Sequence, residues 1–223
     1  MLKLSNETVE VLRNFASINP NLVVNVGSKF STISEAKNIM ATVTVPENFD
    51  RQFGVYDLNE FISVLNLLDD PTIDLTDEAA IIASTGASVR YRFANPSVLT
   101  TPQKEIKMPT AEVKITLKAE TIAQVRKAAS VLGHAIVAVQ GAADGSISVA
   151  VLDPKDSSSN TFTLDLADKH DLGKEFSFQF LIENLKLVPG DYSVEISSKL
   201  ISHWIHNSKQ LSYYVALEKT STI

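Results

Sequence analysis

The sequence predicts an α+β protein of two similar domains, each made of two strand–helix–three-strand (β-α-β-β-β) units. Runs rich in β-branched residues alternate with segments of helical periodicity along the whole chain. The order of these elements starts again after a proline-rich stretch near the middle. Residues of the first predicted helix region also recur at a constant offset, namely Leu4, Glu7, Thr8, Arg13, Ala16 and Ser17 as Leu117, Glu120, Thr121, Arg126, Ala129 and Ser130.

Two helices are expected in the first half of the chain. Residues 5–18 have helical spacing, and Ser5 is a suitable N-cap because its hydroxyl can accept a hydrogen bond from a free backbone N–H. Residues 57–68 have the same spacing, and Asp57 with Glu60 forms a capping box that marks the start of the helix. The predicted apolar faces consist of Val9, Leu12 and Ala16 in the first helix and of Leu58, Phe61, Ile62 and Leu65 in the second.

Strand candidates fill the rest of this half. They are short, rich in β-branched residues and separated by polar breaks, as strands of antiparallel sheets are. The expected strands are residues 21–26, 29–33, 38–45, 49–56, 72–76, 79–84 and 88–93.

The stretch 94–110 contains Pro96, Pro102 and Pro109 and has few periodic apolar residues. Proline fixes φ and lacks an N–H donor, so this stretch is expected to be an extended connector. The predicted domains are therefore residues 1–93 and 111–223.

The same order of elements returns after the connector. A helix is expected at residues 120–132, and a short one at residues 182–188, where Pro189 and Gly190 end it. The inward face of the longer helix is predicted to be Ile122, Val125, Ala129 and Leu132. The expected strands are residues 111–117, 135–140, 146–152, 161–166, 174–180, 191–197, 200–206 and 210–217.

The composition permits a substantial core and excludes several functions. The 223 residues are 44% hydrophobic and include no cysteine, which excludes disulfides, thiolate metal sites and a cysteine nucleophile. With 26 acidic and 20 basic residues the formal net charge is -6, so general attraction to nucleic acid is not expected. The N-terminus turns polar early and no apolar run could span a membrane, which predicts a soluble, cytoplasmic protein.

Motifs for catalysis are missing from the sequence. It contains no P-loop, no dinucleotide-binding glycine pattern and no nucleophile-elbow serine, so no cofactor is expected. His203 and His206 have an H-x-x-H spacing, but on a strand they point to opposite faces, which is poor metal geometry. The spacing of Asp69, Asp70, Asp74 and Asp77 fits no calcium loop. No catalytic or metal-binding residue is therefore predicted, and a metal-dependent enzyme is the less favoured alternative.

Four such units in two domains of this size are the layout of the sliding-clamp superfamily, in which DNA-clamp domains form a ring. The chain resembles one branch of it, the DNA polymerase clamp, or processivity factor, of T-even-like bacteriophages. The resemblance spans nearly the whole chain in order and is carried by LKLS at residues 2–5, LRNFASIN at 12–19, YDLNEF at 56–61, ANPS at 94–97, PGDY at 189–192 and YYVALE at 213–218.

The resemblance implies a homotrimeric ring that encircles duplex DNA, with helices lining the hole and antiparallel sheets outside. Such a ring tethers the replicative DNA polymerase, whose C-terminal tail binds it, and an external ATP-driven clamp loader places it on DNA. The expected location is the cytoplasm of a bacterial host. The sequence leaves open whether this chain also activates late transcription, as relatives do. A β-rich oligomeric viral structural or interaction protein remains an alternative.

In such clamps the subunit contact joins the last strand of the first domain to an edge strand of the second, here residues 88–93 and 161–166. Alternating apolar residues suit a sheet that continues across this contact. The predicted interface residues are Val89, Tyr91, Phe93, Phe162, Leu164 and Leu166.

Helical phase suggests which bases face the DNA. Lys127 lies nearly opposite the inward face of its helix, Arg126 lies on its flank, and Arg13 has the same phase as Arg126. Lys186 is the only base of the fourth predicted helix, and the second offers none. The predicted DNA-facing residues are thus Arg13, Arg126, Lys127 and Lys186.

The resemblance also implies an apolar groove for partner peptides between the connector and the last strand of the second domain. A few apolar anchors supply most of the affinity of such a groove. The candidates are Leu99, Ile106, Met108, Val113, Val215 and Leu217.

Overall fold

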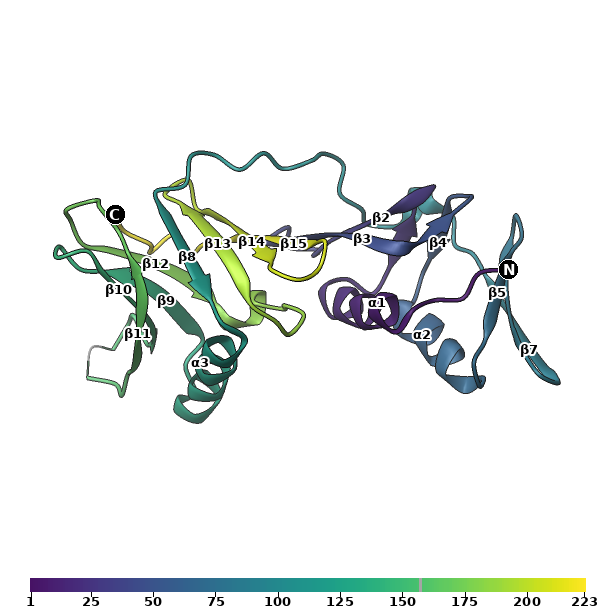
Figure 1. The fold of residues 1–223 in the computed structure, drawn as a ribbon, viewed down its shortest axis with the longest axis horizontal. Helices are drawn as coiled ribbons and strands as arrows, with labels where there is room; N and C mark the ends of the chain where they lie inside the picture. Colours follow the sequence, from purple (N-terminus) through teal and green to yellow (C-terminus); the bar gives the residue numbers. More distant parts are fainter. Residues whose placement is uncertain (157) are drawn as a thin grey trace. The chain divides into compact units, whose positions relative to one another are not determined.

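The computed structural model describes residues 1–156 and 158–223. These residues form two compact units, the N-terminal unit, Met1–Glu105, and the C-terminal unit, Ile106–Ile223 (Figure 1). The division falls inside the proline-containing stretch 94–110. Among the described residues, none of the helices has the length and apolar character that crossing a membrane requires.

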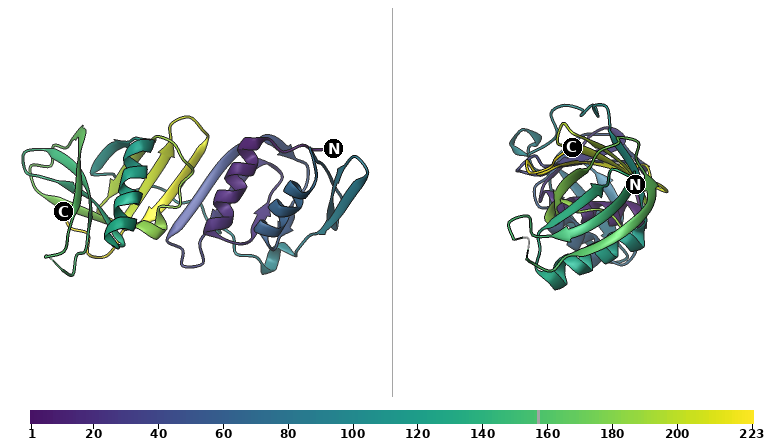
Figure 2. Two further views of the ribbon diagram at one scale, coloured as in Figure 1. Left: turned by 90° about the horizontal axis from the view of Figure 1, so that it is seen from below. Right: turned by 90° about the vertical axis from the view of Figure 1, so that its left-hand side faces the viewer.

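Two helices of the N-terminal unit, α1 (Asn6–Ile18) and α2 (Leu58–Leu67), lie side by side (Figure 2, left). Ser5 caps α1 as predicted, because its hydroxyl accepts from the backbone N–H of Thr8 at 3.2 Å. Asp57 caps α2, because its carboxylate accepts from the backbone N–H groups of Asn59 at 2.9 Å and Glu60 at 3.1 Å. The predicted apolar face of α2 is confirmed, since Leu58, Phe61, Ile62 and Leu65 are buried.

The buried face of α1 differs from the prediction. Leu12 is buried, but Val9 and Ala16 are only half-buried. The helix instead buries the face that carries its largest apolar side chain, Phe15, because a larger side chain removes more apolar surface from water. The buried residues are Thr8, Val11, Leu12, Phe15 and Ile18.

The strands of the N-terminal unit form antiparallel pairs against which the helices pack. They are β1 (Leu22–Val24) with β4 (Phe53–Val55), β2 (Gly27–Ile33) with β3 (Ile39–Phe49), and β5 (Thr72–Leu75), β6 (Ala79–Ser84) and β7 (Ala87–Arg92) in that order. β3 runs past Pro46, where the sequence predicts its end. The proline lies on the exposed side and the register with β2 shifts nearby, so no ladder hydrogen bond from Pro46 is required.

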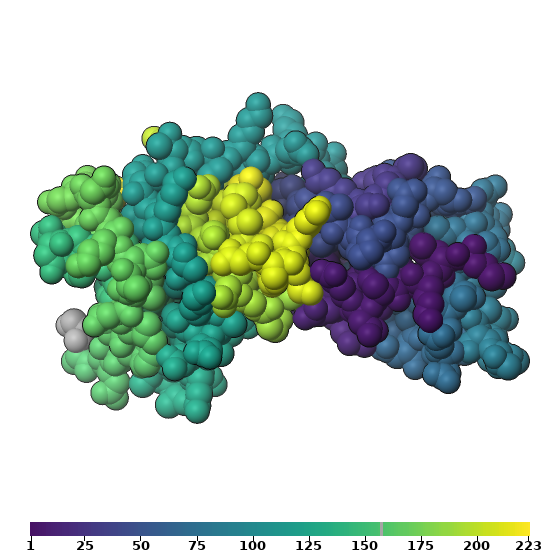
Figure 3. All heavy atoms as spheres, viewed as in Figure 1, coloured from purple at the N-terminus to yellow at the C-terminus, as the bar shows by residue number. Residues whose placement is uncertain are grey.

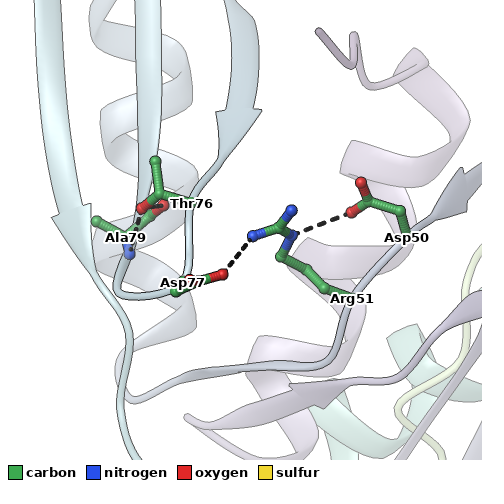
Figure 4. A network of polar contacts seen from close by, with 5 residues as sticks. All are labelled: Asp50, Arg51, Thr76, Asp77 and Ala79. Atoms are coloured by element: carbon green, nitrogen blue, oxygen red, sulfur yellow. Dashed lines mark hydrogen bonds and ion pairs between the residues drawn. The ribbon is translucent and has the colours of Figure 1, made fainter.

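Two turns of the N-terminal unit are joined by Arg51 (Figure 4). Its guanidinium contacts the carboxylates of Asp50 at 3.2 Å and Asp77 at 2.9 Å. The turn that carries Asp77 is closed by Thr76, whose hydroxyl donates to the Ala79 carbonyl at 2.8 Å and accepts from its N–H at 3.0 Å. The carboxylates are exposed, so these ion pairs contribute little stability and mainly orient the turns.

The C-terminal unit repeats this plan with one helix, α3 (Ala119–Leu132), packed on β9 and β10. Gly133 ends the helix in the left-handed conformation, at a φ of 70°. One sheet has the order β11 (Phe162–Lys169), β10 (Ser146–Leu152), β9 (Ile136–Gly141), β12 (Phe176–Leu181). The other strands follow in the order β8 (Val113–Leu117), β13 (Tyr192–Ser197), β14 (Ile201–His206), β15 (Leu211–Ala216), and Figure 3 shows them as a surface from teal to yellow.

The helix predicted at residues 182–188 is not formed, and that prediction was wrong. The segment contains a single 3₁₀ turn, Ile182–Asn184 (η2). Leu185, Leu187 and Val188 are all buried, although they cannot share one face of a helix. Side chains bond the backbone instead: the Val188 N–H donates to the Tyr213 hydroxyl at 3.1 Å, and the Tyr192 hydroxyl donates to the Val188 carbonyl at 2.6 Å. The following proline also disfavours a helical Val188.

Both ends of the chain cover a sheet edge. Leu2 pairs with Ile73 on β5 through two hydrogen bonds of 2.7 Å, and Thr222 pairs with Ser177 on β12 through bonds of 2.9 and 3.0 Å. The opposite outer strands of the same two sheets are β7 and β11. Within the described parts of the chain, no strand pairs with the outer side of either. β7 and β11 are therefore open edges, one in each unit, and β2 and β8 are outermost strands of their units as well.

Candidate functional site

The exposed faces of α1 and α2 meet at Arg13. This side chain is exposed, as predicted, and its guanidinium donates to the Asn66 side-chain carbonyl on α2 at 3.2 Å. The neighbouring face of α2 adds the exposed Glu60 and no base. This pair of helices thus presents one cation that an amide holds in place.

Arg126 and Lys127 are neighbours on α3 but have different surroundings. Lys127 is exposed. The Arg126 guanidinium donates to the backbone carbonyl of Leu185, in the segment that replaces the predicted fourth helix. Burial of the guanidinium lowers the pKa of Arg126, although an arginine stays charged at neutral pH. Arg126 therefore satisfies a backbone group of its own unit, and Lys186, the half-buried residue after Leu185, lies beside this contact.

The N-termini of α1 and α3 are each held by a distant carboxylate. Glu47 on β3 accepts from the Ser5 backbone N–H and the Thr8 hydroxyl. Asp191, just before β13, accepts from the Ala119 N–H and the Lys118 ammonium, both at 2.9 Å. Negative charge at a helix N-terminus is stabilising, so these carboxylates fix the two helices that carry Arg13, Arg126 and Lys127.

These hydrogen bonds also shift the pKa of both acids. Burial alone would raise the pKa of Glu47, but the hydrogen bonds from Thr8 and Ser5 outweigh it and lower the pKa below the ordinary value. The backbone N–H of Ala119 and the Lys118 side chain lower the pKa of Asp191. Both groups are therefore ionised at neutral pH.

The open edge strand β7 carries the first half of the predicted subunit interface. Val89 and Phe93 are half-buried, and Tyr91 is buried. The Tyr91 ring packs edge-on against Phe61 at 5.1 Å and its hydroxyl donates to the Asp57 carbonyl at 3.0 Å. Burial raises the pKa of Tyr91. Tyr91 thus anchors β7 to α2, while Val89 retains an accessible apolar surface.

The open edge strand β11 carries the second half. Phe162, Leu164 and Leu166 are all half-buried on one face of the strand, and the residues between them are exposed. This regular alternation leaves an apolar stripe that its own unit covers only in part. The structure thus brings the predicted interface residues to two open edges, one in each unit.

The predicted groove residues differ in their exposure to solvent. Val113, Val215 and Leu217 are buried in the C-terminal unit, and Leu99 is buried in the N-terminal unit beside Gly54. Ile106 and Met108 are half-buried. The structure does not gather the six into one described pocket; Ile106 and Met108 are the accessible members.

A surface that the sequence reasoning missed lies on the outer face of β14 and β15. His203 stacks on Tyr214 with ring centroids 4.3 Å apart and planes 5° apart, and Ile205 is exposed. Burial lowers the pKa of His203. His206 is buried on the other face, so the two histidines diverge as the sequence predicts. Within the described residues, no group of acidic residues, histidines or cysteines could hold a metal ion.

Solved structures establish the fold class. The proliferating cellular nuclear antigen (PCNA) of Entamoeba histolytica superposes with a TM-score of 0.69 at 15% identity, covering 95% of this chain and 94% of that one. The PCNA of A. fulgidus, solved with the C-terminal region of FEN-1, gives a TM-score of 0.71 at 14% identity, covering 99% and 98%. The chain thus has the fold of a DNA clamp.

Sequence comparisons establish the family. Residues 5–99 match the family model for DNA polymerase processivity factors, and residues 114–219 match the model for the gp45 sliding clamp, C terminal. The sliding clamp of Vibrio phage KVP40 is 32% identical over 97% of this chain and 99% of its own length, and that of Escherichia phage RB69 is 31% identical over 99% of each. The chain belongs to the sliding-clamp family of T4-like phage DNA polymerase processivity factors.

Proposed function

We propose that three copies of this chain close head to tail into a ring around duplex DNA and act there without catalysing a reaction. The open edges of β7 and β11 support this assembly, because each carries apolar residues that a further strand would cover. An interface between two different edges closes into a ring when its rotation divides a full turn. The single observation that carries the proposal is the pair of open edges, β7 in one unit and β11 in the other, that carry partly covered apolar residues.

The helices are the proposed DNA-facing elements. Arg13, Arg126 and Lys127 are exposed, and the half-buried Lys186 adds charge on the C-terminal unit. A few phosphate contacts without base contacts give weak binding that is independent of sequence, which suits a ring that must slide. The overall charge of -6 fits a ring whose attachment is topological rather than electrostatic.

The proposed partners are the replicative polymerase, through its C-terminal tail, and an ATP-driven clamp loader, in the cytoplasm of a bacterial host. The tail would lie on apolar surface at Ile106 and Met108. The end of the connector is well anchored, because the Thr110 carbonyl accepts from the Ser197 hydroxyl at 2.8 Å and Glu112 accepts from the Ser198 N–H at 2.8 Å. A fixed connector end is a suitable rim for a peptide groove.

Primer extension on a singly primed circular template tests the proposal. With the cognate polymerase, loader and ATP, the protein should lengthen the products of a single binding event, and it should not do so without loader or ATP. On a short linear duplex with free ends the effect should be lost, because a ring slides off. Unchanged product length on the circle with all components present would contradict the proposed function.

A further inference from the structure

The two faces of the open strand β7 differ in charge. Arg90 and Arg92 are exposed on one face, whereas Val89 and Tyr91 occupy the other. The Arg90 guanidinium contacts the Glu78 carboxylate at 3.2 Å, but both side chains are more than half exposed, so this pair is weak and leaves Arg90 able to bind elsewhere. The exposed face of the β7 edge is therefore cationic.

The open strand β11 has the complementary pattern. Its exposed face carries Thr163, Asp165, Ala167 and Lys169, and its half-buried face carries the apolar stripe. Asp165 also lines a polar surface hollow together with Glu175 and Ser148. The centre of the β11 edge is thus anionic, with a lysine only at its end.

These patterns fit one antiparallel register better than its neighbours. If Arg90 lies opposite Asp165, the alternation of side chains along both strands puts Tyr91 opposite Leu164. The same register pairs Val89 with Leu166 and Phe93 with Phe162, and it leaves Lys169 opposite Gly86, which has no side chain. All three apolar pairs and the charge pair are then formed together.

The alternatives lose part of this match. A slip of one residue turns the apolar stripe of one strand to the exposed face. A slip of two residues can put Asp165 opposite Arg92. This slip also puts the apolar Val89 opposite Asp168. It brings Lys169 opposite Ser88, close to the like charge of Arg90. A parallel arrangement with Arg90 opposite Asp165 puts Phe93 opposite Asp168. Every described ladder in both units is antiparallel as well.

We propose that, in the self-assembly proposed above, β7 of one copy and β11 of the next join in the register that sets Arg90 opposite Asp165 and Tyr91 opposite Leu164. The inference rests on the proposed self-assembly and adds its register and its charge pair. Arg92, diagonal to Asp165, strengthens the same attraction, while the apolar pairs supply most of the buried surface. The charges act mainly to select the register.

Cysteine pairs test the register, because the natural chain has no cysteine. Ser88→Cys with Ala167→Cys places two thiols opposite each other in the proposed register, where a disulfide can form. Ser88→Cys with Lys169→Cys reports the slipped register, and Ser88→Cys with Thr163→Cys reports the parallel one. All four positions are exposed, so folding should be unaffected. Mild oxidation of the assembled protein is followed on a non-reducing gel.

Covalent dimers and trimers should form efficiently with the Ala167 pair and poorly with the other two. Two results would overturn the register and leave the proposed function intact. One is equal or better cross-linking by either of the other pairs. The other is a protein that still assembles but is cross-linked by none of the three pairs. The natural chain could instead fail to assemble in sedimentation at any concentration and also fail to support the polymerase and loader. That result would overturn both the register and the proposed function.

Charge reversal tests the pair itself. Arg90→Glu and Asp165→Arg should each weaken self-association on the order of tenfold, and the double variant should recover much of the loss. Asp74→Arg, an exposed reversal on β5 of the same sheet as Arg90, is the matched control and should change little. No recovery in the double variant would overturn the Arg90–Asp165 pairing.

Discussion

Glu47 has an unusual position for a charged residue, since it is buried on a strand and only 8% exposed. The first N–H groups of a helix have no acceptor within the helix. The Glu47 carboxylate, on β3, accepts from such a group at the start of α1. Asp191 has the same role at α3. The two homologous helices are therefore positioned by tertiary hydrogen bonds as well as by local caps.

Replacing Glu47 with Gln should lower the free energy of unfolding at neutral pH by about 1–3 kcal/mol, because two hydrogen bonds to a charged acceptor are weakened. The folded-state pKa of Glu47 lies below its ordinary value of 4.5, so its contribution is present above that pH and is lost as the pH falls through the folded-state pKa. Urea unfolding at several pH values measures both effects.

The matched control is Glu35→Gln, an exposed turn residue, which should leave stability unchanged. The difference between the natural chain and Glu47→Gln should shrink as the pH falls below the ordinary value of 4.5 and the natural carboxylate takes up a proton. A difference that stayed constant down to pH 2 would contradict the role of the ionised carboxylate.

Sequence reasoning reached some residue roles and missed others for a physical reason. The cap residues Ser5 and Asp57 act on N–H groups a few residues away, so a local pattern reveals them. Glu47 and Asp191 act on groups far along the chain, and no local pattern marks them. Arg126 has the helical phase of an exposed base, yet its length lets it reach a carbonyl of another segment.

At the scale of elements, the segment Ile182–Gly190 shows how side chains can replace a helix. Leu185, Leu187 and Val188 are all buried, so the segment does not expose one face as a surface helix does. Its backbone groups therefore need hydrogen-bond partners from other elements. Arg126, Tyr192 and Tyr213 provide these partners from α3, β13 and β15. The segment thus depends on α3 for its position.

Arg126→Gln and Lys127→Gln form a matched pair because the residues are adjacent and lose the same charge. Arg126→Gln should lower the free energy of unfolding by about 1 kcal/mol and speed amide hydrogen exchange around Leu185. Lys127→Gln should leave both unchanged and should affect only retention on circular DNA. Urea unfolding, exchange by mass spectrometry and a retention assay measure the three quantities.

Equal effects of the two changes on stability would contradict the assigned contact. Strong periodicity predicts the bounds of α1, α2 and α3 to within one residue at either end, whereas the helix that the sequence predicts at residues 182–188, before a proline, does not form. Burial on all sides removes the periodicity on which that prediction relied.

At the scale of the whole molecule, the fold class followed from the order of elements, but the access of individual residues did not. Val113 is followed by a lysine and Val215 lies between a tyrosine and an alanine, and the sequence cannot tell which face of a strand meets the core and which meets a partner. The resemblance to sliding clamps, rather than any local pattern, singled out residues 88–93 and 161–166 as edge strands, and the structure has β7 and β11 as the outermost strands of their sheets.

Leu164→Glu should abolish assembly and processivity together while the single chain stays folded, because the half-buried residue lies on the open edge rather than in the core. The mass measured by sedimentation should fall from about three times the chain mass of 24.3 kDa to about the mass of one chain. Val26→Glu, at an exposed apolar residue of the N-terminal unit, is the control and should change neither.

A monomeric Leu164→Glu variant that still supported long products would contradict the proposed ring. The circular dichroism spectrum and thermal midpoint of the single chain separate lost assembly from lost folding. Both should match those of the diluted natural protein.

Because each chain offers one open edge of each kind, a copy damaged at β11 still offers an intact β7. In a cell that makes equal amounts of natural and damaged copies, the damaged ones would enter nascent assemblies and leave them unclosed. In the three-copy ring proposed above, only about one in eight assemblies would then contain natural copies alone. Such a defect would therefore act dominantly over the natural gene.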